Sequence, residues 1–420
     1  MKKTEPAIKR TVLPNGIRVL SERAPHVDSV SVGIWVQAGS RWEDPKTLGI
    51  SHFVEHMLFK GTEKRTAKQI ADEMDSLGAH LNAFTDKEYT CYYAKVLKEH
   101  LDVAIDVLSD MTLHSVLEPV EIEREKNVVL EEIKRHEDTP DDLVHDLFAQ
   151  GLWQRHPLGY AVIGTKKTVK ALTQERLFSY MAEEYSPDNT VIAAAGHLEH
   201  EQLVDLTARM LGDWTGAHSP SDRESVHPVA QESFIRKRTE QVHFCIGAAG
   251  YAQTNDDKYT LAVIDSILGG GMSSRLFQEI REKRGLAYAI GSYSASYKEA
   301  GLFAVYGGTS LASFDEVLDL TRKEFRSILK DSATEAEIER SKNQIRGSLV
   351  LGQESMSNRM SRMAKSEIYF GRITPLDEIV QAVMAVSRDG ITRVARELFS
   401  DTELALTAIG PFKTAEAARR

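Results

Sequence analysis

Two histidines four residues apart, with a glutamate between them, are the residues in this sequence best suited to chemistry. His52 and His56 lie in "ISHFVEHMLFKGT" (residues 50–62), and Glu55 directly precedes the second histidine. On a helix these histidines lie one turn apart on one face. Two imidazoles so placed can reach one ion, and Zn²⁺ favours imidazole and carboxylate ligands. Glu55 lies on the same side, so its carboxylate can stand beside a metal-bound water without binding the ion.

The flanking residues argue against the alternative, a surface helix with two ordinary histidines. They are apolar nearly all round the helix: Phe53, Val54, Met57, Leu58 and Phe59. Such a helix should be buried, and buried histidine and glutamate side chains need partners. A metal ion would supply them. The pattern H-x-x-E-H is also the reversed form of the zincin motif.

A third ligand must come from elsewhere, because a catalytic zinc usually has three protein ligands and an open position. Residues 118–138, "EPVEIEREKNVVLEEIKRHED", predict a strong helix on which Glu125 and Glu132 lie two turns apart along one face. The apolar side of this helix is marked by Ile122, Val128, Val129 and Ile133. Spacing alone does not choose between Glu131 and Glu132, although Glu132 lies nearer that apolar side.

Alternating strands and helices are expected around these residues. "RTVL" and "IRVL" flank Pro14-Asn15-Gly16, a strong signal for a hairpin turn. The remaining expected elements of the first half are a strand at 29–39, helices at 48–59 and 66–77, strands within 80–96, helices at 98–113 and 118–137, a strand at 190–196 and a helix at 199–214.

The second half of the chain repeats landmarks of the first. Gly39 pairs with Gly250, and Gly196 with Gly410, at nearly equal offsets of about 210 residues. This predicts a duplicated α/β unit, with domains at 1–215 and 231–420 and a linker at 216–230 that is rich in Ser, Pro, Gly and charge. Ser266 falls opposite His52, so the second copy does not keep the metal site.

Composition places the chain among ordinary soluble globular proteins. It has 420 residues, of which 42% are hydrophobic and 27% charged, enough for two or three domains. No apolar run approaches the roughly 18 residues of a transmembrane helix. The first residues carry positive charge without an apolar segment behind them, so we expect no secretory signal. Two cysteines, Cys91 and Cys245, make no disulfide framework and predict a reducing cytoplasm.

The net negative charge of the chain affects which partners it can bind. The formal net charge is −10, which repels nucleic acid and anionic membrane overall. It would suit a cationic substrate, or it serves solubility only. Gly269–Gly271 do not make a phosphate loop, because no G-K-[ST] follows them. A helix cap and a tight turn explain these glycines better.

At this point the chain resembles a known family in five segments that occur in the family's order. The segments are "GSRWEDPKTLGISHFVEHMLFKGT", "LGAHLNAFTDKEYTCYYAKV", "YSPDNTVIAAAG", "LGGGMSSRLFQEIREKRGLAYAIGS" and "RMAKSEIYFGR". They resemble the insulinase and mitochondrial-processing-peptidase family of zinc metallopeptidases (M16), in its short bacterial subfamily B. The resemblance implies an α+β fold of two homologous domains, each a mostly antiparallel sheet packed with helices, as in the LuxS/MPP-like metallohydrolases.

The resemblance also implies roles for the residues around the motif. In the family a glutamate ligand follows H-x-x-E-H by about 76 residues, and this spacing selects Glu132 as the third ligand of one zinc ion per chain. Glu125 matches a second glutamate that supports the site without binding the metal. Glu55 would then be the general base that takes a proton from water and delivers it to the leaving amine.

Two further matches concern the substrate. Arg281 and Tyr288 in "REKRGLAY" have the spacing of the pair that holds the substrate backbone in active members. Without the family, they would read as a solvated helix charge and a half-buried strand residue. Asn82, Ala83 and Phe84 in "LNAFT" match the edge strand with which the substrate pairs, a sequence-tolerant mode of peptide binding.

A weaker match concerns specificity. Asp142 and Asp146 match acidic positions that recognise an arginine upstream of the cut in the mitochondrial enzymes. They are four residues apart and share one face of an expected helix. The alternative is a solvated helix start within "EDTPDDLVHD".

In the family, the zinc domain faces a chamber whose opposite wall comes from another half of the molecule. One 420-residue chain supplies only half of it. We therefore expect a homodimer in which the zinc of one subunit works with Arg281 and Tyr288 of the other. The alternatives are a catalytically silent structural subunit and the catalytic half of a heterodimeric processing peptidase.

Overall fold

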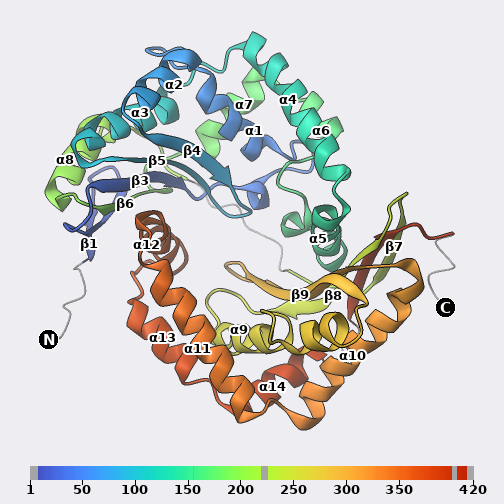
Figure 1. The fold of residues 1–420 in the computed structure, drawn as a ribbon. Coiled ribbons are helices and arrows are strands. Elements are labelled where there is room, and N and C mark those ends of the chain that lie inside the picture. The colour runs from blue at the N-terminus through green and yellow to red at the C-terminus, as the bar shows by residue number, and fades with distance from the viewer. Residues whose placement is uncertain (1–7, 155, 219–225, 400–403, 414–420) are drawn as a thin grey trace, which may run out of the picture. The chain divides into compact units, whose positions relative to one another are not determined.

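The computed structural model describes residues 8–154, 156–218, 226–399 and 404–413 (Figure 1). The chain forms two compact units. The N-terminal unit comprises Met1–Ile133, Tyr160–Arg223 and Gly352–Thr374, and the C-terminal unit comprises Lys134–Gly159, Glu224–Leu351 and Pro375–Arg420. Part of the linker expected at 216–230 lies outside the described residues.

The N-terminal unit contains a six-stranded sheet. Its strands are β1 (Ile8–Val12), β2 (Arg18–Arg23), β3 (Ser29–Val36), β4 (His80–Thr85), β5 (Thr90–Leu97) and β6 (Thr190–Gly196). They lie in the order β1-β2-β6-β3-β5-β4. Only β2 and β6 run parallel; the other neighbours are antiparallel. The expected hairpin is present, with Val12 opposite Arg18 and Gly16 at a φ of 100° in its turn.

Helices cover both faces of this sheet. Those from the first half of the chain are α1 (Ile50–Met57), α2 (Ala67–Ser76), α3 (Leu101–His114), α4 (Pro119–Glu137), α6 (Lys166–Lys170), α7 (Gln174–Glu184) and α8 (His200–Leu211). On β3, Val32 and Ile34 join the core beneath these helices. Trp35 points to the opposite face, where it packs in a second cluster with Met360. Because both faces are covered, nearly all of β3 is buried.

The cover of that second face comes from the far end of the chain. Helix α12 (Met356–Phe370) contributes Met356, Met360 and Met363 to the cluster around Trp35. The buried carboxylate of Glu22 on β2 forms ion pairs with Arg359 and Arg362 of α12. The compact unit is therefore not a continuous stretch of sequence.

The C-terminal unit has a five-stranded sheet of the same kind. Its strands are β7 (Glu232–Arg236), β8 (Val242–Gly250), β9 (Ala287–Ser296), β10 (Gly301–Thr309) and β11 (Ala405–Gly410), in the order β7-β11-β8-β10-β9. Its helices include α5 (Pro140–Leu152), α9 (Asp257–Leu268), α10 (Phe314–Asp331), α11 (Glu335–Gly352), α13 (Leu376–Met384) and α14 (Arg388–Phe399). Val144 and Phe148 of α5 pack with Cys245 and Ile409 of this sheet. A helix from the first half of the sequence thus covers the second sheet.

Topology confirms the predicted fold class. The series β2-β6-β3-β5-β4 and β7-β11-β8-β10-β9 match strand for strand, each with one parallel pair at its start. Gly196 and Gly410, the paired landmarks, end β6 and β11. The division into 1–215 and 231–420 differs from the compact units, because α5 and α12 are each packed on the sheet formed by the other half of the sequence.

No helix within the described ranges is both long and apolar enough to cross a lipid bilayer.

Candidate metal centre

Helix α1 carries the histidine motif on a half-buried polar face. Gly49, the N-cap residue just before this helix, has a φ of 90°, a conformation that favours glycine. A Cβ there would meet the carbonyl oxygen of Ile163 at 2.7 Å. Phe53, Val54 and Met57 are fully buried in the core of the N-terminal unit. This burial confirms the prediction made from the apolar flanks, and it leaves the two histidines and Glu55 on the remaining face.

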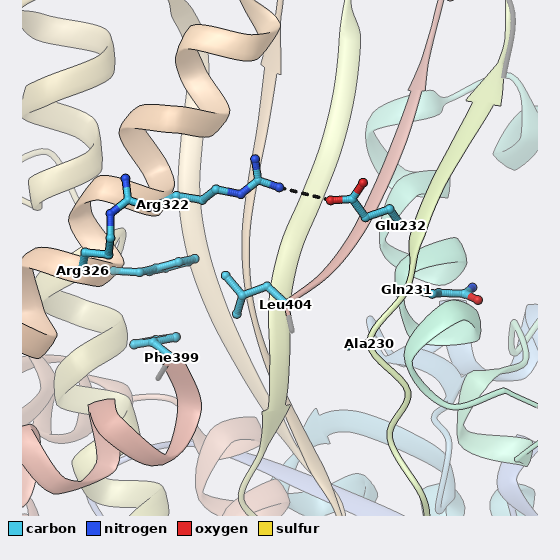
Figure 2. A pocket seen from close by; sticks show the side chains of 8 residues that line it. Ala230, Gln231, Glu232, Arg322, Arg326, Phe399 and Leu404 are labelled. Atoms are coloured by element: carbon cyan, nitrogen blue, oxygen red, sulfur yellow. Dashed lines mark hydrogen bonds and ion pairs between the residues drawn. The ribbon is translucent and has the colours of Figure 1, made fainter. Parts of the chain in front are cut away.

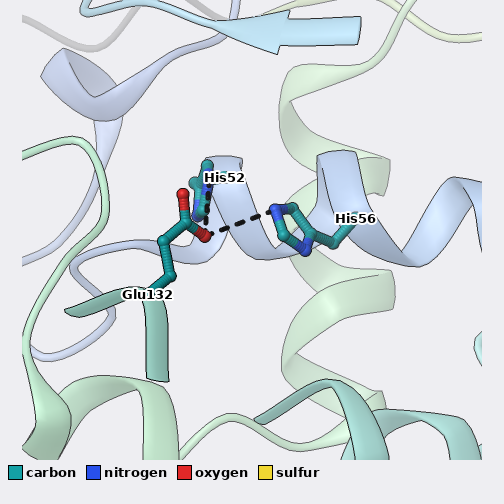
Figure 3. A group of neighbouring side chains, drawn as sticks. All are labelled: His52, His56 and Glu132. Atoms are coloured by element: carbon teal, nitrogen blue, oxygen red, sulfur yellow. Dashed lines mark ion pairs between the residues drawn. The ribbon is translucent and has the colours of Figure 1, made fainter. Parts of the chain in front are cut away.

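Helix α4 brings Glu132 to the two histidines (Figure 3). Glu132 Oε2 lies 3.7 Å from Nε2 of His52 and 3.7 Å from Nε2 of His56. One potential ligand atom from each of the three residues lies within 4.8 Å of the others. Ligands about 2 Å from a tetrahedral zinc ion are separated by roughly 3.3 Å, so small side-chain adjustments suffice to bind one. Glu131 is exposed, and no other such cluster occurs among the described residues.

The environment of His52 suits a neutral metal ligand. Burial, together with the nearby charge of His56, lowers the pKa of His52 to about 4. At neutral pH its imidazole is therefore unprotonated, as metal binding requires. Its Nδ1 is buried without a hydrogen-bond partner, whereas its Nε2 faces Glu132.

Glu125 supports the other histidine from the same helix as Glu132. His56 Nδ1–H donates to Glu125 Oε1 at 2.8 Å, which leaves Nε2 for a metal. Lys60 Nζ lies 2.5 Å from the other carboxylate oxygen of Glu125. Burial alone would lower the pKa of His56, but its bond to Glu125 and the surrounding carboxylates raise it. Burial would raise the pKa of Glu125, but the bonds from His56 and Lys60 lower it.

Lys60 was missed in the sequence. The available signal was its position four residues after His56, which puts it one helical turn further along. It is the last residue of a short 3-10 turn, Leu58–Lys60, that continues α1. Its ammonium group keeps Glu125 ionised and therefore able to hold the His56 ring.

Replacing Glu125 by glutamine should weaken metal binding without unfolding the protein. The amide keeps the shape but loses the charge that faces His56 and Lys60, and removing such a supporting partner typically costs about 10- to 100-fold in metal affinity. Competition for Zn²⁺ with a chromophoric chelator would measure the change. Glu123→Gln is the matched control, because Glu123 is an exposed residue of the same helix paired with Lys126. Equal zinc affinities for the two variants would contradict the supporting role.

A residue on the neighbouring edge strand, β4, orients the Glu55 carboxylate. Thr85 Oγ1 donates to Glu55 Oε2 at 2.6 Å. Burial raises the pKa of Glu55, and the bond from Thr85 opposes this shift. A raised pKa brings a carboxyl nearer to the working range of a general base. Thr85 was not identified from the sequence, because its contact with α1 depends on the position of β4 in the sheet.

Strand β4 is at an edge of its sheet and ends at Thr85. It contains Asn82, Ala83 and Phe84, of which Asn82 is exposed. On one side β4 pairs with β5, with Asn82 opposite Tyr93. The main-chain groups on its other side have no strand partner in the described sheet, so an extended peptide could add there.

Arg281 and Tyr288 come together in the C-terminal unit. Arg281 belongs to a single-turn π-helix, Phe277–Glu282, and Tyr288 lies at the start of β9. The guanidinium carbon lies 5.0 Å from the centre of the Tyr288 ring and 4.7 Å from that of Phe277. The Tyr288 side chain is 78% exposed. Stacking thus holds the half-buried Arg281 guanidinium beside the exposed Tyr288 side chain.

Asp142 and Asp146 lie on α5, as expected, also in the C-terminal unit. Asp142 is exposed. Asp146 is half-buried, and its Oδ2 accepts from His136 Nε2 at 3.0 Å. The two side chains therefore have different environments, and only Asp142 is fully open to a cationic group.

A cavity of about 530 Å³ in the C-terminal unit offers different chemistry (Figure 2). Arg322 Nη2 donates to Glu232 Oε1 at 3.2 Å, and both residues line the cavity. Phe399 and Leu404 contribute apolar walls, and Arg326 a second cation. Its described lining holds one carboxylate and neither histidine nor cysteine, so it lacks the donors of a zinc site.

Two family models match the chain along most of its length. The model described as "Insulinase (Peptidase family M16)" matches residues 18–166, which include the three candidate ligands. The model described as "Peptidase M16 inactive domain" matches residues 171–345. The metal motif thus lies in the segment matched by the first model, and the second model begins inside the N-terminal unit.

Curated relatives and solved structures agree with these matches. The "Uncharacterized zinc protease YmxG" of Bacillus subtilis (strain 168) is 42% identical over 96% of this chain and 98% of the relative. A zinc protease of Streptomyces coelicolor, SCO5738, is 39% identical over 98% of this chain and 91% of the relative. A protease from Helicobacter pylori has the same fold, with a TM-score of 0.90 and 21% identity over 97% of this chain and all of that one. The chain therefore belongs to peptidase family M16, the insulinase family.

Proposed function

We propose that the protein is a zinc-dependent endopeptidase that cleaves peptides or unfolded, presequence-like segments. The observation that carries this proposal is the meeting of His52, His56 and Glu132 beside Glu55, at the end of an open edge strand. That combination supplies a metal's donors, a carboxylate that does not bind the metal, and a template for an extended peptide. The two free, buried cysteines suit a reducing cytoplasm, which we propose as its location.

Zinc, when bound by His52, His56 and Glu132, would polarise the scissile carbonyl and acidify the attacking water. Glu55 would take a proton from that water on its carboxylate and pass it to the leaving amine. Thr85 would hold the Glu55 carboxylate in place through its 2.6 Å hydrogen bond.

The edge of β4 would bind the peptide through main-chain hydrogen bonds, which tolerate many sequences. Arg281 and Tyr288 would donate hydrogen bonds to the substrate backbone or to the developing oxyanion. Asp142, and Asp146 in part, would favour an arginine upstream of the cut. Cleavage of a basic peptide library, with zinc content measured on the same sample, tests the function as a whole.

A homodimer is part of the same proposal, with each site combining the metal of one subunit and Arg281/Tyr288 of the other. Mixing two inactive variants, Glu55→Gln and Arg281→Ala, tests this arrangement. Random exchange would restore about a quarter of the wild-type sites, because one of the two sites in each mixed dimer is intact. If both residues of a site came from one subunit, mixing would restore nothing.

Two alternatives predict different results. A catalytically silent structural subunit would hold no zinc and cleave no peptide, and the intact set of donors argues against it. The catalytic half of a heterodimeric processing peptidase would be a monomer by size-exclusion mass and would need a second protein for activity. The homodimer predicts twice the chain mass and activity without a partner.

A further inference from the structure

A short segment before α1 contains charged side chains that apolar packing does not explain. Arg41 is 2% and Glu43 5% exposed, and both lie within the N-terminal unit. Burying a charge costs free energy unless partners compensate for it. The partners of these two residues therefore indicate what the segment does.

Glu43 binds the beginning of the metal-binding helix. Its Oε2 accepts from the backbone N–H of Gly49 at 2.7 Å, and its Oε1 accepts from that of Ser51 at 2.9 Å. N–H groups at the start of a helix have no partner within the helix, and a negative charge there is favoured by the helix dipole. Ser51 directly precedes His52 in the chain. One carboxylate thus holds the first turn of α1 by two bonds.

The same segment is tied to the turn between β4 and β5. The backbone N–H of Arg41 donates to the carbonyl of Lys87 at 2.8 Å, and the Arg41 guanidinium forms a buried ion pair with Glu88. A Cβ on Gly39 would lie 2.3 Å from the carbonyl oxygen of Asp86, so only glycine permits this approach.

This turn follows directly on Thr85, the partner of Glu55. The segment therefore joins the two elements whose meeting places the Glu55 carboxylate. A shift of α1 along its axis would move His52, His56 and Glu55 together relative to β4 and α4. By binding the first turn of α1, Glu43 prevents such a shift.

We propose that Glu43 is a positioning residue, which fixes the start of α1 and so sets His52 and Glu55 against Glu132 and Thr85. Its effect on catalysis rests on the proposed peptidase function. Its effect on the helix does not, because the two backbone bonds exist whether or not a metal is bound.

The charge state of Glu43 provides one readout. Burial raises its pKa to about 7, against the lowering effect of the bonds from Gly49 and Ser51 and of the Lys87 charge. Tyr180 of α7 also faces it. Since the unfolded chain ionises this carboxyl first, its contribution to stability is present below about pH 4.5 and is lost as pH rises to about 7. Glu43→Gln should remove this part of the pH dependence of unfolding.

The decisive experiment compares Glu43→Gln with Asp44→Asn in the full chain. Both changes turn a carboxylate into an amide, but Asp44 is exposed and its carboxylate accepts from Lys46 N–H within its own loop. An amide at position 43 can accept one of the two N–H groups and not both. At about pH 8.5, where the Glu43 carboxyl is ionised and accepts both bonds, hydrogen exchange of the α1 amides should therefore be about tenfold faster in Glu43→Gln than in the wild type. Exchange in α3 of the same unit should stay unchanged, as should α1 exchange in Asp44→Asn.

In Glu43→Gln, zinc affinity and kcat should each fall about tenfold, while KM stays within twofold. Zinc affinity is measured by chelator competition with Zn²⁺ alone. Unchanged exchange in α1, or equally faster exchange in α3, would overturn the positioning role. If the wild-type chain neither binds zinc nor cleaves peptides, the proposed function fails, and the exchange comparison still decides the role of Glu43.

Discussion

Glu55→Gln should reduce kcat for peptide hydrolysis by about 10³-fold and leave the zinc content at one ion per chain. Glutamine has the same shape and can still accept the hydrogen bond from Thr85 Oγ1, which is 2.6 Å long in the wild type. It cannot take a proton from water at any working pH. Because Glu55 does not belong to the three-residue ligand cluster, metal binding should be nearly unaffected. Steady-state hydrolysis of a basic peptide would measure kcat, and elemental analysis of the same protein would measure its zinc content.

Glu63→Gln is a suitable control for that measurement. Glu63 is exposed and lies shortly after α1, so the same chemical change there should leave kcat within twofold. A Glu55→Gln enzyme that contains zinc and hydrolyses peptide at the wild-type rate would refute the general-base assignment. Loss of zinc together with activity would instead mean that Glu55 supports the metal.

Glu132→Gln should abolish the stabilisation that zinc gives to the folded chain. A ligand that binds the folded state at 100 times its Kd raises the free energy of unfolding by about 2.7 kcal/mol. With Glu132 replaced by a neutral amide, two histidines remain, and we expect the zinc-dependent rise in thermal stability to vanish. Peptide hydrolysis should be lost with it. Thermal unfolding with and without added Zn²⁺ measures the effect directly.

The matched control is Glu131→Gln, one residue away on the same helix. Glu131 is exposed, whereas Glu132 Oε2 lies 3.7 Å from both histidines. The control should keep the full zinc-dependent stabilisation. The opposite result, with zinc stabilisation lost only in Glu131→Gln, would mean that α4 binds the ion by a different face.

The sequence pattern predicted which residues of α1 face the candidate site, but it did not predict which face of α4 is buried. The burial of α1 followed from its apolar residues, and His52, His56 and Glu55 share its open face as helical spacing predicts. On α4, the sequence pattern predicts that Val128 marks the apolar side, but its side chain is 50% exposed. The helix pattern alone therefore left Glu131 and Glu132 open, and the family spacing was needed to choose.

Contacts that depend on the order of strands could not be read from local patterns. Thr85 reaches Glu55 only because β4 lies at the edge of the sheet beside α1. The periodicity of α5 and α12 shows that each has an apolar face, but it does not say which sheet that face will cover. The linear domain boundaries at 215 and 231 therefore differ from the compact units, in which α5 and α12 each pack on the sheet formed by the other half of the sequence.

That exchange affects how the chain folds as it is synthesised. The face of the first sheet that carries Trp35 is covered by methionines of α12. Residues up to 223 complete the rest of the N-terminal unit, yet its last segment ends at Thr374. At 5–20 residues per second, a ribosome needs roughly 8 to 30 s to make the intervening chain. During that interval the nascent unit presents an uncovered apolar sheet face, and we expect a truncated first half to expose this face and not to reach its final form.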